Sequence, residues 1–284
     1  MSLLNKDNFQ SKSFAKPIII LVATLLIVGG TYSLFGSKKE KSEDVKNENA
    51  LEINSSGIDP EMKVKNAADV EKVIAKWIEA NPKAIIDSVA NMQKKAMEDQ
   101  QKDAKKNIID KRSELESEDS PSFSPSGYDV TIIEFFDYSC GYCKKAQAIL
   151  DSLVKEDKKI RIIYKEFPIF GQSSVDVSQV AIAVHLIDKN SYKKFHDAMM
   201  KSNAKGREEA IKIAKSVGVD SSKLEATLKN DQAKIDKILQ ENSELGHAIG
   251  INGTPGFVVG EELIPGAIDL NSFKEKIAAL RNKK

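Results

Sequence analysis

The sequence Cys140-Gly141-Tyr142-Cys143 lies between a predicted strand and a predicted helix, and this placement decides the fold. The residues before it, 130–136, are apolar, β-branched and aromatic, which predicts a buried strand. The residues after it, 144–155, carry apolar side chains at helical spacing. Cys140 is therefore expected at the N-terminus of a helix, with Ser139 as the helix cap.

The two cysteines predict redox chemistry, and they are the only cysteines among the 284 residues. A helix N-terminus stabilises negative charge, so Cys140 is expected to form a thiolate, which attacks disulfides where a thiol does not. Cys143, one turn later, can then release the mixed disulfide. The other interpretations are weaker. A structural zinc site needs about four ligands, a c-type haem needs histidine where Lys144 stands, and so short a disulfide loop would add little stability.

Composition and the N-terminus indicate where the chain acts. The net charge of +1 gives no reason to expect a nucleic-acid partner. Residues 17–37 carry no charge and residues 18–28 are continuously apolar, which predicts an export segment over 1–36. This segment is either a signal peptide or an uncleaved anchor, and the lysines on both sides leave that choice open. We expect a periplasmic protein, soluble after cleavage or tethered to the inner membrane by residues 17–36, in a compartment that tolerates disulfides.

The next part of the chain is polar and then helical. Residues 37–59 predict a flexible tether, and residues 60–118 predict a helical stalk of amphipathic helices. Asn81-Pro82 should separate two of these helices, with Asn81 as the cap of the second. The apolar stripe of the stalk either folds back on the C-terminal domain or joins several copies of the chain. Residues 119–127 are a linker by composition.

The remaining residues, 128–284, predict an α/β redox domain. A second strand at 159–167 completes a βαβ unit with a parallel strand pair. Residues from about 172 to 249 predict a helical insertion of four or five helices. A short strand at 257–259, a hairpin partner beginning at 261–263 and a last helix at about 270–280 complete the domain.

Two motifs together resemble the DsbA-like thioredoxin-fold family: the strand followed by CxxC, and Gly253-Thr254-Pro255 opening a later strand. The resemblance covers about 128–284 and implies a thioredoxin-like fold with a helical insertion. It implies that Cys140 is the exposed nucleophile and Cys143 the buried resolving cysteine. It also implies that Pro255 is a cis-proline beside the dithiol. The helices at 60–118 resemble those of the oligomeric ScsC-like and Com1-like branch.

The resemblance also assigns roles around the dithiol. Thr254, Gly141 and Tyr142 are expected to contact substrate. Glu134 matches the family's buried acid, and a carboxyl among apolar neighbours in a central strand should have a raised pKa and accept the Cys143 proton. A Glu134 that faces the sheet edge is the alternative. Two further charged residues and the three histidines are expected to have lesser roles: Lys165 as a candidate partner of Glu134, Asp137 in a solvated loop, and His185, His196 and His247 in packing or at the surface.

These patterns predict an exported thiol–disulfide oxidoreductase that forms or rearranges disulfides in envelope proteins, without metal or cofactor. Its expected partners are unfolded or misoxidised proteins, a membrane redox partner, and further copies of itself through residues 60–118. The Gly141-Tyr142 dipeptide lacks the histidine of strongly oxidising family members, which predicts a weaker oxidant. The alternative is a non-enzymatic copper-binding or interaction protein of the envelope, because two thiolates can bind Cu(I).

Overall fold

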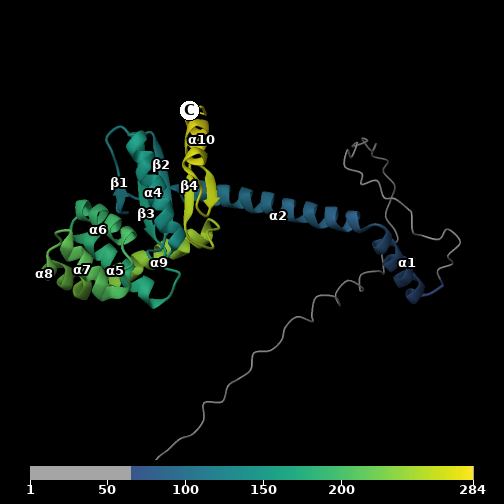
Figure 1. Cartoon of the computed structure of the whole chain (residues 1–284), viewed down its shortest axis with the longest axis horizontal. Helices are drawn as coiled ribbons and strands as arrows, with labels where there is room; N and C mark the ends of the chain where they lie inside the picture. Colours follow the sequence, from purple (N-terminus) through teal and green to yellow (C-terminus); the bar gives the residue numbers. More distant parts are fainter. Residues whose placement is uncertain (1–64, 284) are drawn as a thin grey trace, which may run out of the picture. The chain divides into compact units, whose positions relative to one another are not determined.

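The computed structural model describes residues 65–283 (Figure 1). The predicted export segment, 1–36, and tether, 37–59, lie outside the described residues. Among the helices within 65–283, none combines the length and hydrophobicity that a membrane crossing requires. The described residues all belong to one compact unit.

A five-stranded sheet with the order β1-β3-β2-β4-β5 forms the centre of the redox domain. Its middle strand, β2 (Val130–Phe136), pairs in parallel with β3 (Ile160–Glu166) and antiparallel with β4 (Gly256–Val259). β5 (Glu262–Pro265) forms one edge, antiparallel to β4. The predicted βαβ unit and hairpin are therefore confirmed. Cys140 and Cys143 follow the carboxyl end of β2.

The other edge strand, β1 (Ser122–Phe123), lies in the segment predicted to be a linker. It pairs antiparallel with β3, so that Ser122 lies opposite Ile163. Tyr164 N–H also donates to the Pro121 carbonyl at 2.8 Å. The Ser- and Pro-rich composition of 119–127 gave no strand pattern, because a two-residue strand is too short to show alternation. This segment is thus packed on the sheet edge, which the sequence did not predict.

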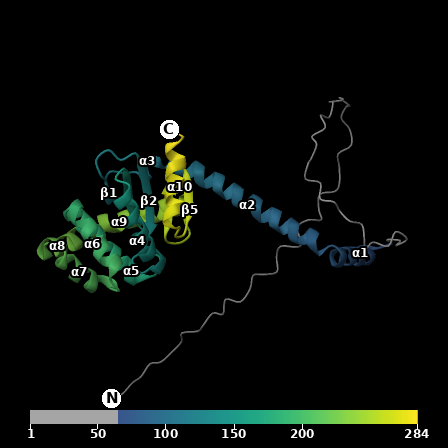
Figure 2. The same ribbon diagram turned by 45° about the horizontal axis from the view of Figure 1, so that its top comes forward.

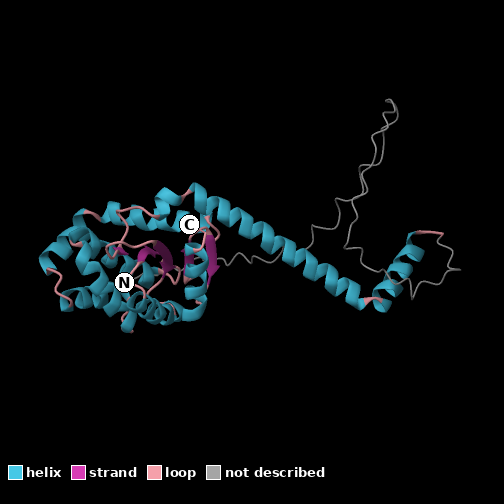
Figure 3. Cartoon of the chain, turned by 90° about the horizontal axis from the view of Figure 1, so that it is seen from above, coloured by secondary structure: helices cyan, strands magenta, loops and turns pink. Residues whose placement is uncertain are grey.

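Two apolar cores lie on the two faces of the sheet, as the alternation along β2 requires. Ile132 and Phe136 face a core shared with α4 (Gly141–Glu156) and α10 (Leu270–Arg281), two helices that contact each other (Figures 1 and 2). Ile133 and Phe135 face a second core, to which Ile108, Leu115 and Leu245 contribute. Figure 3 shows helices flanking the strands on both sides.

Five helices form the predicted insertion between β3 and β4, and their bounds agree closely with the sequence patterns. The central one is α5, whose residues 177–185 are all buried and which contacts each of the other four helices. The five are α5 (Gln172–Ile187), α6 (Lys189–Lys201), α7 (Gly206–Ser216), α8 (Ser221–Asn230) and α9 (Gln232–Ala248).

The N-terminal helices are α1 (Ala67–Ala80), α2 (Pro82–Asp110) and the short α3 (Arg112–Leu115). The break between α1 and α2 is where Asn81-Pro82 predicted it. Asn81 is the N-cap residue of α2, as predicted, but its side chain makes no capping hydrogen bond to α2. Its Nδ2 donates backwards to the Trp77 carbonyl at 2.9 Å. Only the end of α2 packs on the redox domain, through Ala104 and Ile108. The stalk therefore folds back onto the redox domain at this end, whereas the apolar side chains along α1 and the first half of α2 are exposed.

Candidate active site

The dithiol lies where β2 leads into α4. Cys140 itself is the N-cap residue of α4, with extended backbone, and Cys143 lies in the first turn. Ser139 was predicted as the cap, and this is wrong. It precedes the cap, its N–H donates to Asp137 Oδ1 at 2.7 Å, and its Oγ lies 2.9 Å from Ser174 Oγ. Both cysteines are free thiols in this structure.

The two thiols have opposite acidities. The pKa of Cys140 is lowered to about 5, chiefly by a hydrogen bond from the Cys143 side chain and against the effect of burial. Backbone N–H groups at the start of α4 add to this stabilisation. The pKa of Cys143 is raised far above its usual value by burial, then by its bond to Cys140 and the charge of Glu134. At neutral pH, Cys140 is thus the thiolate and Cys143 the neutral thiol.

Cys140 is less accessible than the resemblance implied. Its exposed fraction is 4%, while Cys143 is wholly buried. The reason is the loop at Thr254-Pro255, whose Thr254 carbonyl accepts a hydrogen bond from the Cys140 thiol at 3.3 Å. Beside it, the Tyr142 side chain is exposed. The expectation of an openly exposed nucleophile is therefore corrected to one that a protein loop covers.

The Thr254-Pro255 peptide bond is cis, as the resemblance implied. β4 begins at the next residue and pairs directly with β2, so that Gly256 lies opposite Phe135. The Thr254 hydroxyl is buried and has no hydrogen-bond partner among residues 65–283 while Cys140 is a thiol. It contributes to the lowered pKa of Cys140, because it is placed to donate to the thiolate. The structure thus brings Thr254, Pro255 and Cys140 together.

Glu134 is fully buried, which excludes the edge-facing alternative. Neither of its carboxyl oxygens has a hydrogen-bond partner in the described part of the chain. Burial raises its pKa to about 8, and the negative charges at Cys140 and Glu166 add to the effect. Because Glu134 shares the sheet face of Ile132 and Phe136, its side chain lies on the same side as α4 and Cys143.

Lys165 is not the partner of Glu134, contrary to the sequence-based expectation. In the parallel register Tyr164 lies beside Glu134, while Lys165 lies beside Phe135 and so faces the opposite side of the sheet. There, Lys165 Nζ donates to the Glu114 carbonyl at 3.0 Å and to Ser120 Oγ at 2.8 Å. Burial lowers the pKa of Lys165 to about 8.

Asp137 was expected in a solvated loop and is instead fully buried. Its Oδ1 accepts from Ser139 N–H and from Ser174 Oγ at 2.8 Å. Its Oδ2 accepts from the N–H groups of Ile169 at 2.8 Å and Phe170 at 3.2 Å. The carboxylate therefore ties the loop that carries Cys140 to the segment after β3 and to α5. The sequence could not reveal the burial of Asp137, because the four groups that donate to it lie in loops and at the start of α5.

A second buried acid, Glu166, was also missed. It accepts hydrogen bonds from the hydroxyls of Tyr192 at 2.8 Å, Ser178 at 2.8 Å and Tyr138 at 3.2 Å. Burial nevertheless raises its pKa to about 8. The reasoning used for Glu134, an acid inside an apolar strand, would have found it in β3. Through Tyr138, Glu166 links the insertion to the residues just before the dithiol.

The histidines are consistent with packing and surface roles. His196 is buried, with Nδ1 3.2 Å from the Tyr138 hydroxyl and Nε2 2.9 Å from Gln147 Oε1, and burial holds its pKa well below the usual value. His185 Nε2 lies 2.9 Å from the Asp119 carbonyl, and His247 is exposed on α9. Within residues 65–283, no cluster of three or more His, Cys, Asp or Glu side chains is arranged to hold a metal ion.

Comparison with known families decides the classification. The family described as a DSBA-like thioredoxin domain matches residues 131–278. The chain belongs to the DSBA-like thioredoxin family. The range matched by this DSBA-like family contains Glu134, Cys140, Cys143 and Pro255. A comparison with curated proteins finds no match.

Solved structures agree with the DSBA-like classification. The thiol-disulfide exchange protein alpha-DsbA2 from Wolbachia pipientis is 29% identical with a TM-score of 0.59, and the match covers 62% of this chain and 95% of that one. A thioredoxin-like oxidoreductase from Silicibacter pomeroyi is 31% identical with a TM-score of 0.56, covering 60% and 98%. A linker-deletion mutant of Proteus mirabilis ScsC shares the fold at 22% identity with a TM-score of 0.58, and that match covers 78% of this DSBA-like chain and 99% of the mutant chain.

Proposed function

We propose that this chain catalyses thiol–disulfide exchange in protein substrates, with Cys140 as the nucleophile and Cys143 as the resolving cysteine. The observation that carries the proposal is the opposite shift of the two thiol pKa values, lowered to about 5 at Cys140 and strongly raised at Cys143. Only a nucleophile that is already a thiolate attacks disulfides at neutral pH. The similarity to a thiol-disulfide exchange protein at 29% identity adds support.

The proposed reaction balances in two steps. The Cys140 thiolate attacks a substrate disulfide, forms a bond to one substrate sulfur, and releases the other as a thiolate. Cys143 then loses its proton and attacks the Cys140 sulfur, which closes the Cys140–Cys143 disulfide and releases the second substrate thiolate. In this direction the substrate is reduced, and the reverse direction oxidises it. Release of a mixed disulfide before Cys143 acts allows rearrangement of wrong disulfides.

Glu134 is the proposed acceptor for the Cys143 proton. Its pKa of about 8 makes it a usable base near neutral pH, and it lies on the sheet face that Cys143 packs against. The negative charge of Glu134 raises the pKa of Cys143, and the charge of Cys140 raises the pKa of Glu134. Formation of the mixed disulfide removes the charge at Cys140, so the proton transfer is coupled to the first step.

The proposed substrates are unfolded or misoxidised proteins. Thr254 and Tyr142 line a hollow of about 460 Å³, which we call the Tyr142 hollow, together with Pro255, Ile149 and Ile268. Its lining is mainly apolar, which suits exposed hydrophobic segments of many sequences. Gly141 starts α4 directly after Cys140 and has open space where a side chain would stand, so a substrate segment can lie against its backbone.

The proposed setting is the periplasm, with a membrane redox partner that resets the dithiol. Residues 17–36 support export, since their sequence fits a signal peptide or an anchor. Self-association through the stalk is proposed as well, because its apolar side chains are exposed along α1 and the first half of α2. These side chains are Val70, Ile74, Ile78, Ile85, Ile86, Val89 and Met92. Particle mass in solution tests this proposal.

The test of the proposed function uses the purified full chain with a scrambled, disulfide-bonded protein as substrate. We expect the wild type to restore native disulfides, Cys140→Ser to be inactive, and Cys143→Ser to accumulate a mixed disulfide. Stoichiometric Cu(I) uptake without any exchange in these assays would overturn the proposal and favour a copper carrier.

A further inference from the structure

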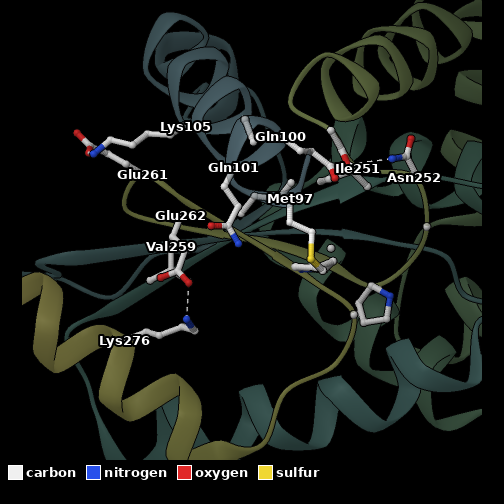
Figure 4. A pocket seen from close by; sticks show the side chains of 18 of the residues that line it. Met97, Gln100, Gln101, Lys105, Ile251, Asn252, Val259, Glu261, Glu262 and Lys276 are labelled. Carbon is white, nitrogen blue, oxygen red and sulfur yellow. Dashed lines mark hydrogen bonds and ion pairs between the residues drawn. The ribbon is translucent and has the colours of Figure 1, made fainter. Parts of the chain in front are cut away.

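A second and larger hollow also borders the Thr254-Pro255 loop. It has a volume of about 1190 Å³ and is formed by α2, the loop at 250–256, the β4–β5 hairpin and α10. We call it the α2 groove. Figure 4 shows Met97, Gln100 and Gln101 on its α2 side, and Ile251 and Asn252 on its loop side.

The α2 groove is built by contacts that fix α2 against the redox domain. Ala104 and Ile108 on α2 are buried. Asn107 Nδ2 donates to the Ala248 carbonyl at 2.7 Å, which attaches α2 to the end of α9. Lys105 Nζ lies 2.8 Å from Glu261 Oε2 on the β4–β5 hairpin. The groove is therefore a preformed feature of the domain.

The chemistry of the α2 groove suits a polypeptide. Gln100, Gln101 and Asn252 bring side-chain amides to it, and an amide both donates and accepts hydrogen bonds, as a peptide group does. The Met97 side chain is 62% exposed on one wall, and flexible methionines accommodate varied side chains.

Charge in the α2 groove is balanced, which argues against a specific ionic ligand. Lys105 is paired with Glu261, and Lys276 with Glu262. The other two charged lining residues, Glu275 and Lys283, carry opposite charges, so the lining has no net charge. A nucleotide, a phosphate or a strongly basic peptide would find no excess of opposite charge. An unfolded protein segment of mixed composition requires none.

We propose that the α2 groove binds the stretch of a protein substrate that flanks its reacting cysteine, so that α2 is one wall of the substrate site. This inference rests on the proposed exchange function. Thr254 and Pro255 line both the α2 groove and the Tyr142 hollow. Because Thr254 also contacts Cys140, a substrate chain that crosses this loop with its sulfur at Cys140 can contact both hollows.

A cross-linking experiment tests the α2 groove directly. In the full chain carrying Cys143→Ala, Cys140 attacks a scrambled protein substrate and remains bonded to it. A photoreactive benzoylphenylalanine replaces Gln101 in the groove or, as the matched control, Gln93, which is about 12 Å away on α2 and does not line the groove. We expect light-dependent cross-links to the trapped substrate from position 101 and none from position 93.

Each outcome has a distinct meaning. Equal cross-linking from both positions, or none from position 101 while the mixed disulfide is present, would overturn the α2 groove as a substrate site and leave the exchange function standing. Absence of any mixed disulfide on a non-reducing gel would overturn the exchange function, and this inference with it. The two failures are therefore distinguishable in one experiment.

A kinetic comparison uses two matched double variants. Gln100→Ala/Gln101→Ala removes two amides from the groove, and Asn91→Ala/Gln93→Ala removes two from the exposed helix elsewhere. We expect the first pair to lower kcat/KM for the unfolded protein about ten-fold relative to the exchange rate with glutathione, which is the effect of losing two hydrogen bonds. The second pair should leave this ratio unchanged. A ratio unaffected by the first pair would overturn the inference.

Discussion

Replacing Glu134 by glutamine tests the central electrostatic feature of the site. The pKa of this carboxyl is about 8 in the folded protein against 4.5 in its ordinary environment, so the folded state holds the proton more tightly than the unfolded state. Stability is then highest at low pH and is lost as the pH rises from 4.5 through 8. At about 1.4 kcal/mol per pKa unit, the ionisation of Glu134 removes about 3 kcal/mol of stability between pH 5 and pH 8.

Glu134→Gln keeps the shape of the side chain and cannot ionise. The variant therefore does not lose the stability that ionisation of Glu134 removes from the wild type as the pH rises. We expect the variant and the wild type to differ little at pH 5, and the variant to be more stable by about 3 kcal/mol at pH 8. The assay is urea unfolding of the reduced full chain, monitored by circular dichroism. Tryptophan fluorescence is less suitable, because the only tryptophan, Trp77, lies in α1 and reports poorly on the redox domain.

The disulfide form supplies the control for this experiment. Closing the disulfide removes the negative charge at Cys140, the second cause of the raised pKa of Glu134, so the difference between variant and wild type should shrink. The similarly raised pKa of Glu166 is present in both proteins and cancels in the comparison. If the difference in unfolding free energy between Glu134→Gln and the reduced wild type stays the same from pH 5 to pH 8, the reasoning is refuted.

Three further predictions concern Asp137, the dithiol and the exposed stripe of α1 and α2. Asp137→Asn should destabilise the protein by about 2 kcal/mol, since the amide nitrogen cannot accept the bonds that the second carboxylate oxygen accepts, and urea unfolding against wild type measures this. The thiolate absorbance of Cys140 should titrate with a midpoint at about pH 5. Cys143→Ala should raise that midpoint, because it removes the main hydrogen bond that stabilises the thiolate. An unchanged midpoint would contradict the role assigned to Cys143. Ile86→Asp, within the exposed stripe, should reduce the particle mass measured by light scattering to that of one chain, and an unchanged mass would argue against self-association through this stripe.

The sequence predicts most of the fold because its apolar patterns are strong. The run 130–136 is continuously apolar apart from Glu134 and Thr131, and it forms β2 with the predicted bounds. Each insertion helix is marked by apolar residues at helical spacing, and polar residues separate one helix from the next. The short strand β1 escapes prediction because it is defined by the free edge of β3 rather than by its own residues.

The site is predicted less completely, because its geometry depends on contacts between distant segments. Asp137 is buried only because the segment after β3 folds back and aims two N–H groups at it. Lys165 fails as a partner of Glu134 because the register of β2 and β3 places it on the opposite face. The low exposure of Cys140 likewise depends on a loop more than a hundred residues away in sequence.

The equilibrium reduction potential of the Cys140–Cys143 pair tests the central claim most directly. Thiolate pKa values of about 3.5 and 7 accompany potentials of about −120 mV in DsbA and −270 mV in thioredoxin, so a Cys140 pKa of about 5 predicts about −180 mV. This value also agrees with the weaker oxidant that the Gly141-Tyr142 dipeptide predicts. Full-length protein equilibrated in glutathione buffers should show a reversible two-electron transition near that potential. Absence of any reversible transition would contradict the account, since the dithiol would then have no redox function.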